Sequence, residues 1–132
     1  MENLIKDFLK QKRFAVAGSF RDESKFAYKI FKVLTGRGYE VFPVNPRISE
    51  VDGKVCYKTV SDIPYSVDVV NIVTPPSVTE NILKECFRKG IKRVWIQPGA
   101  ENEAAIKFCK NNNIAVIHSM CVILETLKEE EI

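Results

Sequence analysis

The feature that most constrains this chain is the alternation of short apolar runs with segments whose apolar residues recur at helical spacing. Each run has the length of a buried strand. Strands that alternate with helices build a parallel sheet covered on both faces. We therefore predict an α/β, Rossmann-like, doubly wound parallel sheet of five strands in the order 3-2-1-4-5. The predicted strands are Phe14–Gly18, Tyr39–Val44, Val67–Val73, Arg93–Ile96 and Ile114–Ile117.

The first strand, Phe14–Gly18, leads into a polar loop, Ser19–Ser24, and then into a predicted amphipathic helix, Lys25–Arg37. In an open parallel sheet, such a strand, turn and helix direct backbone N–H groups and the positive end of a helix dipole at one point outside the sheet. Phosphate groups bind well at such a point. This unit is therefore the predicted centre of function.

The size and charge of the chain limit its class. Its 132 residues predict one domain, 1–132, in which 1–12 form a packing helix with Leu4, Ile5, Phe8 and Leu9 on one face. The net charge of +3 is spread along the chain, so we predict no nucleic-acid partner. No apolar run approaches the ~20 residues that cross a bilayer, so we predict no membrane partner.

The four cysteines form no CxxC pair, so we predict no metal site and free thiols in a cytoplasmic protein. Two local patterns lie between the strands. Residues 48–66 predict an irregular crossover with a turn at Asp52-Gly53 and at most one short helical turn at Ser61-Asp62-Ile63-Pro64. Ser77 and Glu80 fit a capping box that starts the next helix.

The candidate binding residues follow the ends of the predicted strands. Because the carboxyl ends of parallel strands share one edge of the sheet, their loops should form one cleft. Backbone donors and small polar groups dominate these loops, which suits a nucleotide better than an apolar ligand. The loops are Gly18–Ser24, Asn45-Pro46-Arg47, Thr74-Pro75-Pro76, Gln97-Pro98-Gly99 and His118-Ser119.

The usual dinucleotide fingerprint is absent, because Phe20 and Glu23 stand where its second and third glycines would lie. The acidic residue that binds the ribose of NAD is also missing, and Asn45 and Arg47 follow the second strand instead. A cation there suits a ribose that carries an extra phosphate. NADP, phosphorylated at the 2′ position, and coenzyme A, phosphorylated at the 3′ position, both satisfy this pattern.

The sequence offers no catalytic constellation. His118 is the only histidine, and no Ser–His–Asp set or carboxylate pair can be assembled around it. Cys121 follows the last predicted strand near the start of the terminal helix, a position that favours a reactive thiolate. The other cysteines are predicted core residues.

Five stretches of this sequence resemble the small, single-domain CoA-binding proteins, which share their fold with the CoA-binding domain of succinyl-CoA synthetase α subunits. They span residues 13–124, and Val44-Asn45-Pro46 and WIQPGAENEAA from Trp95 are the most specific. The stretches are AVAGSFRDESKFAYKIF, GYEVFPVNPR, VDVVNIVTPPSVTENILKEC, GIKRVWIQPGAENEAAI and NNNIAVIHSMCVI.

The resemblance implies a ligand, coenzyme A or an acyl-CoA, and a place for each part of it. Gly18, Ser19, Phe20 and Arg21 would line the diphosphate, with Lys25 nearby. Asn45 and Arg47 would face the ribose and its 3′-phosphate, and Thr74 and Pro75 would border the adenine or the diphosphate. Gln97, Pro98 and Gly99 would flank the pantetheine, and His118 and Cys121 match recurring positions of the family.

Three residues depart from the family pattern. Phe20 replaces a hydroxyl side chain, Ala27 replaces a glycine and Glu23 replaces a proline, and each is predicted to weaken phosphate binding. The chain also has no ATP-grasp domain, so ligase activity is not implied. We therefore expect a non-catalytic binding or regulatory module. The alternatives are an NADP(H)-binding, oxidoreductase-like domain and a redox role through a mixed disulfide between Cys121 and CoA.

Overall fold

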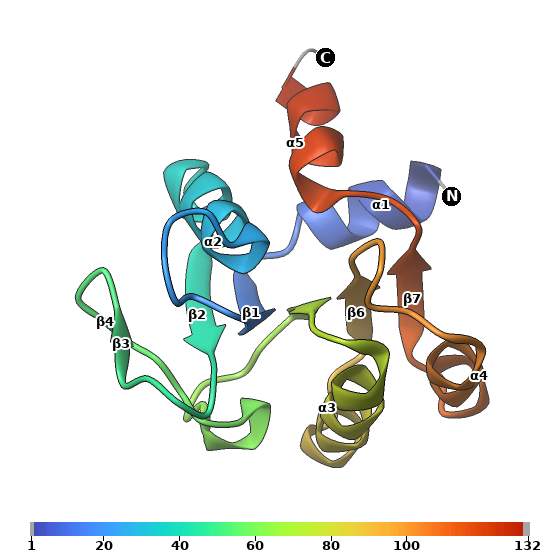
Figure 1. Cartoon of the computed structure of the whole chain (residues 1–132). Helices are drawn as coiled ribbons and strands as arrows, with labels where there is room; N and C mark the ends of the chain where they lie inside the picture. Colours follow the sequence, from blue (N-terminus) through green and yellow to red (C-terminus); the bar gives the residue numbers. More distant parts are fainter. Residues whose placement is uncertain (1, 131–132) are drawn as a thin grey trace.

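The structure, a computed structural model, describes residues 2–130, and a five-stranded parallel sheet lies at its centre (Figure 1). The strand β1 is hydrogen-bonded on both sides, so that Phe14 pairs with Val41 of one neighbour and with Val69 of the other. The strands, from one edge to the other, are β2 (Glu40–Val44), β1 (Arg13–Gly18), β5 (Val69–Val73), β6 (Arg93–Ile96) and β7 (Ala115–His118).

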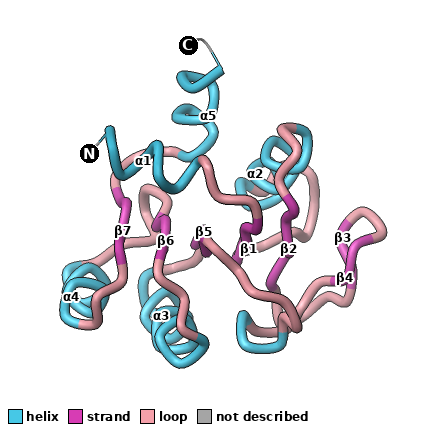
Figure 2. Tube along the Cα trace, turned by 180° about the vertical axis from the view of Figure 1, so that it is seen from behind, coloured by secondary structure: helices cyan, strands magenta, loops and turns pink. Residues whose placement is uncertain are grey.

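Helices cover both faces of the sheet, as predicted (Figure 2). One face carries α3 (Pro76–Lys89) and α4 (Glu103–Asn111), and the other carries α1 (Glu2–Leu9), α2 (Phe26–Gly36) and α5 (Val122–Glu130). The apolar core is divided accordingly into two clusters, one on each side of the sheet. The predicted Rossmann-like α/β class is therefore confirmed. None of the helices described is long and apolar enough to span a membrane.

The sheet is consistent with the predicted order 3-2-1-4-5 when the short segment beside β2 is counted as the third strand. We expected Val67–Val73 at that place, but β5 pairs with β1, so the five strands of the sheet run 2-1-3-4-5 in the numbering of the prediction. The place beside β2 belongs to Tyr57, which forms a single parallel bridge with Val44 and donates its N–H to the Pro43 carbonyl at 3.0 Å. The apolar run around Tyr57 is too short for a full strand, which is why the sequence pattern did not reveal it.

The crossover after β2 is more regular than expected. It contains a hairpin of β3 (Glu50–Val51) and β4 (Lys54–Val55), followed by a 3₁₀ turn, η1 (Val60–Asp62). Asp52 and Gly53 have φ of 49° and 82°, the left-handed values of a tight hairpin turn. Tyr28 donates its hydroxyl to the Asp52 carboxylate at 2.9 Å, which ties the hairpin to α2.

The capping box predicted at Ser77 and Glu80 is wrong. The N-cap of α3 is Pro75, without a side-chain hydrogen bond, and the helix begins at Pro76. Proline suits the first turn because its φ is already helical and its missing N–H has no partner there. Glu80 instead accepts a hydrogen bond from Asn102 at 3.0 Å, which links α3 to the N-cap of α4.

The N-terminal helix α1 packs on the domain and ends at Leu9, and Met1 lies outside the described residues. Phe8 is buried and its ring meets Trp95 edge to face, with centroids 6.0 Å apart. Arg93 donates to Asp7 at 2.8 Å, and this contact lowers the pKa of the Asp7 carboxyl. These contacts anchor α1 to β6, beneath the middle of the sheet.

Candidate functional site

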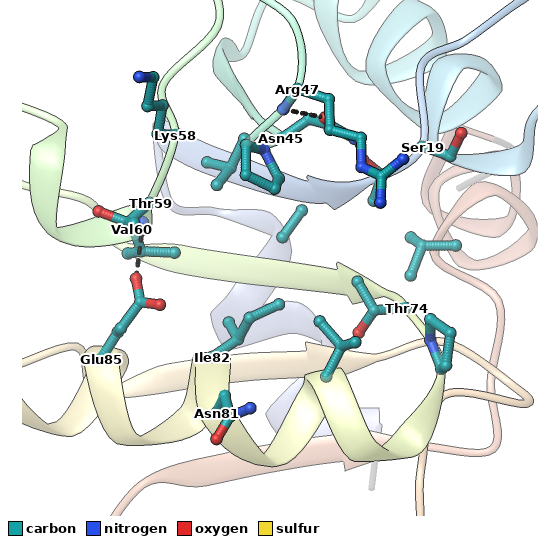
Figure 3. A pocket seen from close by; sticks show the side chains of 17 residues that line it. Ser19, Asn45, Arg47, Lys58, Thr59, Val60, Thr74, Asn81, Ile82 and Glu85 are labelled. Atoms are coloured by element: carbon teal, nitrogen blue, oxygen red, sulfur yellow. Dashed lines mark hydrogen bonds between the residues drawn. The ribbon is translucent and has the colours of Figure 1, made fainter.

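A cavity of about 470 Å³ lies where the carboxyl ends of β1, β2 and β5 meet (Figure 3). The helix α3 runs along one side and the segment 58–60 closes another. The volume falls in the range of roughly 300–1,000 Å³ that is typical of small-molecule sites. Residues predicted from three separate loops line it together: Gly18, Ser19, Asn45, Arg47, Thr74 and Pro75.

A second cavity, of about 670 Å³, adjoins the first and shares Ser19, Asn45 and Arg47 with it. The predicted residues Phe20 and Arg21 line this cavity. Two arginine residues, Arg21 and Arg47, therefore line the same space, and the Arg21 Nε lies 3.9 Å from the Asp22 carboxylate. Such a space suits phosphate groups, because arginine binds them through charge-assisted hydrogen bonds.

Phe20 has a different role from the one expected. Its side chain is buried, and its ring meets Phe31 of α2 edge to face at a centroid distance of 6.1 Å. The aromatic side chain therefore anchors the loop to α2. It does not take the place of a hydroxyl group that would face a phosphate. Any contact between this loop and an anion would come from its backbone and from Ser19 and Arg21.

Gly18 allows three elements to approach one another at the end of β1. A Cβ atom added there would lie 2.8 Å from the Cβ of Ala27 in α2 and 2.8 Å from the carbonyl oxygen of Val73 in β5. Only glycine fits this position. Ala27 is buried and faces Gly18, so the methyl group that replaces the family's glycine fills a contact between helix and strand.

Asn45 fixes the geometry of the site. Its Nδ2 donates to the Gly18 carbonyl at 2.7 Å, and its Oδ1 accepts the Arg47 backbone N–H at 2.8 Å. The side chain thus connects the loop after β1 with the loop after β2. The second of these hydrogen bonds holds the Arg47 backbone above the cavity. Because both polar ends of the Asn45 amide are bonded within the protein, the role of this side chain is mainly structural.

The Arg47 side chain is exposed at the rim, and Figure 3 shows it extending across the cavity toward Ser19. Arg47 forms no ion pair with any of the described residues. Its charge is therefore available to a ligand.

The start of α2 faces the same region without a cap of its own. Lys25 is the N-cap and makes no side-chain hydrogen bond, and the first turn contains no acidic residue. The preceding loop is braced internally, because Ser24 donates its hydroxyl and its N–H to Asp22, which lowers the pKa of that carboxyl. Unpaired N–H groups at a helix start attract anions. Lys25 itself lines neither cavity.

The predicted residues after β6 lie outside the two cavities. Gln97 is buried, and its Oε1 accepts the Val122 N–H at 3.1 Å, so that it ties the start of α5 to the sheet. Pro98 and Gly99 are exposed at the same edge, and Gly99 adopts a positive φ of 93°. Gln97 is thus placed as a structural residue, whereas Pro98 and Gly99 remain accessible.

His118 and Cys121 lie further along the edge, at and after the end of β7. Two strands, β5 and β6, separate this position from β1. The Nδ1 of His118 is 3.0 Å from the Ser119 hydroxyl, and the Cys121 side chain is partly exposed. Neither residue lines the two cavities, so the structure does not bring them to the phosphate loop.

The prediction missed the wall opposite Arg47. It is formed by the segment 58–60, which follows the Tyr57 bridge, and by one side of α3. Glu85 is the notable residue here, because it continues the spacing of Val78 and Ile82 and so places a carboxylate on the helix face that lines the cavity, together with Asn81. A carboxylate at a position that continues the apolar spacing of Val78 and Ile82 was the feature of the sequence that could have indicated this wall.

The fold is that of a Rossmann-like α/β domain with a candidate small-molecule site at the carboxyl ends of its strands. The family model described as "CoA binding domain" matches residues 12–126, and the chain therefore belongs to this CoA-binding family.

Named relatives agree with this assignment. The chain is similar to an ADP-forming acetate–CoA ligase of Methanocaldococcus jannaschii, with 35% identity over 119 residues, 84% of this chain. It spans only 17% of that ligase. An uncharacterized protein of Bacillus subtilis is 29% identical and is matched over 88% of its length. A solved structure of a hypothetical protein from Pyrococcus horikoshii superposes with a TM-score of 0.91 at 30% identity, covering 96% of this chain and 89% of the other.

Proposed function

We propose that this chain binds coenzyme A or an acyl-CoA and serves as a binding or regulatory module. The observation that carries the proposal is the position of Arg47, whose side chain borders both cavities at the edge where β1 and β2 end. A cation at this place fits a ribose that carries a phosphate beyond the diphosphate. Membership of the CoA-binding family supports the choice of ligand.

In this proposal the adenosine occupies the cavity of about 470 Å³, whose lining includes Val44, Val60 and Ile82. The diphosphate lies over Ser19 and Arg21 near the start of α2, and the 3′-phosphate pairs with Arg47. The pantetheine arm then follows the sheet edge past Pro98 and Gly99 toward β7. Adjacent strands lie about 4.8 Å apart, so an extended chain crosses their ends in short steps.

The lining of the cavities supports binding more than catalysis. Its only carboxylates are Glu50 and Glu85, and it contains neither histidine nor cysteine. No nucleophile is therefore paired with a base at the site. Ligase activity is named for relatives of which this chain spans only 17% and 20%, and we do not extend that activity to it.

Calorimetry with CoA and with dephospho-CoA tests this proposal. A charged hydrogen bond between Arg47 and a phosphate is worth about 1.5–3 kcal/mol, so dephospho-CoA should bind at least about tenfold more weakly. Arg47→Ala should weaken CoA by a similar factor and leave dephospho-CoA nearly unchanged. Arg88→Ala, at an exposed position of α3, is the matched control. Equal affinity for both ligands would remove the role of Arg47, and binding of neither would refute the proposal.

NADP(H) is the second candidate, since the same Arg47 could pair with a 2′-phosphate and no acidic residue lies at the end of β2. The dinucleotide fingerprint is incomplete, however, because Phe20 and Glu23 stand where its second and third glycines would lie. Titration of NADPH, followed by its fluorescence, separates the two candidates. Saturable enhancement at lower concentrations than CoA requires would favour the dinucleotide.

A further inference from the structure

Glu85 is an unusual residue for the wall on which it lies. It projects from α3 into the end of the cavity that is remote from Arg47 and Ser19 (Figure 3). Its neighbours along the wall are the apolar Val60, Val78 and Ile82 and the polar Thr59 and Asn81. Glu85 is partly buried, and a partly buried carboxylate is stabilised by hydrogen-bond donors.

One oxygen of Glu85 already has its donor. Oε1 accepts the backbone N–H of Val60 at 3.0 Å, so that the side chain is held between α3 and η1. The other oxygen has no partner among the described residues. Lys58, which lines the same cavity, points away from the carboxylate in Figure 3. An oriented hydrogen-bond acceptor therefore lines the end of the cavity remote from Arg47.

The two ends of the cavity consequently have opposite electrostatic character. Arg47 attracts phosphate at one end, whereas the negative charge of Glu85 repels it at the other. Apolar side chains between them suit the faces of a planar heterocycle. A nucleotide should therefore enter with its base toward Glu85, and its base should present a donor to the free oxygen.

We propose that Glu85 selects adenine among purines by accepting a hydrogen bond from the exocyclic amino group at C6. A purine without this group leaves the carboxylate unpaired, and a C6 carbonyl would oppose one acceptor to another. Glu85 is thus a specificity-determining residue for the base. This inference rests on the proposed function, because it requires an adenosine phosphate in this cavity.

Two nucleotides that differ only at C6 test the inference, namely adenosine 3′,5′-bisphosphate and purine riboside 3′,5′-bisphosphate. Calorimetry on the wild-type chain should show the adenosine compound binding at least about tenfold more tightly, as expected for one hydrogen bond to a charged group. In Glu85→Gln, the amide oxygen can still accept the Val60 N–H while the amino group faces the cavity. The preference for adenine should then fall below about threefold.

The matched control is Glu80→Gln, the same substitution on the same helix at a residue that does not line the cavity. It should retain the wild-type ratio. If Glu85→Gln does not fold, Glu85→Asp, which withdraws the carboxylate by one methylene, should show the same loss of preference. Equal affinity of the wild type for the two nucleotides, or an unchanged ratio in the folded variant, overturns the inference while CoA binding stands. Failure to bind CoA or either nucleotide overturns both proposals.

Discussion

Replacing Gly18 with alanine should destabilise the protein, because the added methyl group has no space. Its carbon would lie 2.8 Å from the Cβ of Ala27 and 2.8 Å from the carbonyl oxygen of Val73. Nonbonded carbon atoms normally approach to about 3.5–4.0 Å. The neighbours belong to α2 and to the backbone of β5, so relief requires a shift of secondary-structure elements.

The size of the effect follows from this geometry. Overpacking of a rigid core typically costs about 1–3 kcal/mol, and two simultaneous close contacts favour the upper part of that range. For a chain of this length, each kcal/mol lowers Tm by about 3–6 °C. We therefore expect Gly18→Ala to reduce the free energy of unfolding by about 2–3 kcal/mol and Tm by about 6–18 °C.

A double-mutant cycle with Ala27→Gly identifies the cause. Ala27→Gly alone should cost about 1 kcal/mol, because glycine weakens a helix. In the double variant the contact between the two Cβ atoms is absent, whereas the contact with Val73 remains. The combined loss should therefore be smaller than the sum of the single losses by about 0.5–1.5 kcal/mol. Urea denaturation, followed by circular dichroism, measures all four free energies.

Gly36→Ala is the control, because a Cβ added to this residue of α2 has no heavy atom within 4 Å. Alanine there should leave the protein unchanged or stabilise it by up to about 1 kcal/mol. Strict additivity in the cycle, or a Gly18→Ala protein as stable as the wild type, would refute the packing argument.

Two further predictions concern charge and thiols. The lowered pKa of Asp7 means that its ion pair with Arg93 stabilises the fold above the ordinary carboxyl pKa of 3.8, and that this stabilisation is lost as the pH falls through the lowered value. Asp7→Asn should cost about 0.2–1 kcal/mol at pH 7, and in urea titrations the difference from wild type should disappear once the pH lies below the lowered pKa of Asp7. Burial raises the pKa of the Cys109 thiol to about 11 and also raises the pKa of the Cys86 thiol. Both thiols should therefore resist modification at pH 8. The partly exposed Cys121 should instead react with CoA disulfide, forming a mixed disulfide and releasing one CoA thiolate. Peptide mass spectrometry locates the adduct, and modification at another cysteine, or at none, would count against the redox role of Cys121.

The alternation of apolar runs and helical stripes was enough to predict the parallel sheet and the two helical layers. Each of these elements is encoded locally, because a strand or helix needs its own apolar pattern. The Tyr57 bridge and the start of α3 at Pro76 were not predictable in this way. A single bridge residue has no periodicity, and the capping pattern of Ser77 and Glu80 competed with a proline that suits the first helical turn.

The residues of the candidate site likewise fall into those that the sequence could predict and those that it could not. Gly18, Ser19, Asn45, Arg47, Thr74 and Pro75 follow strand ends, and parallel strands necessarily bring such residues to one edge. Glu85 and the segment 58–60 do not follow a strand end, and they reach the cavity only because α3 crosses back beside the loop that follows Tyr57.

By itself, the sequence determined which edge of the sheet would carry the site and that a cation would stand there, because strand direction and local residue type are written in the chain. Only the tertiary structure decided that Phe20 and Gln97 are buried supports, that Asn45 clamps two loops, and that Glu85 faces Arg47 across a cavity. These facts depend on distances between segments far apart in the chain, and packing alone determines such distances.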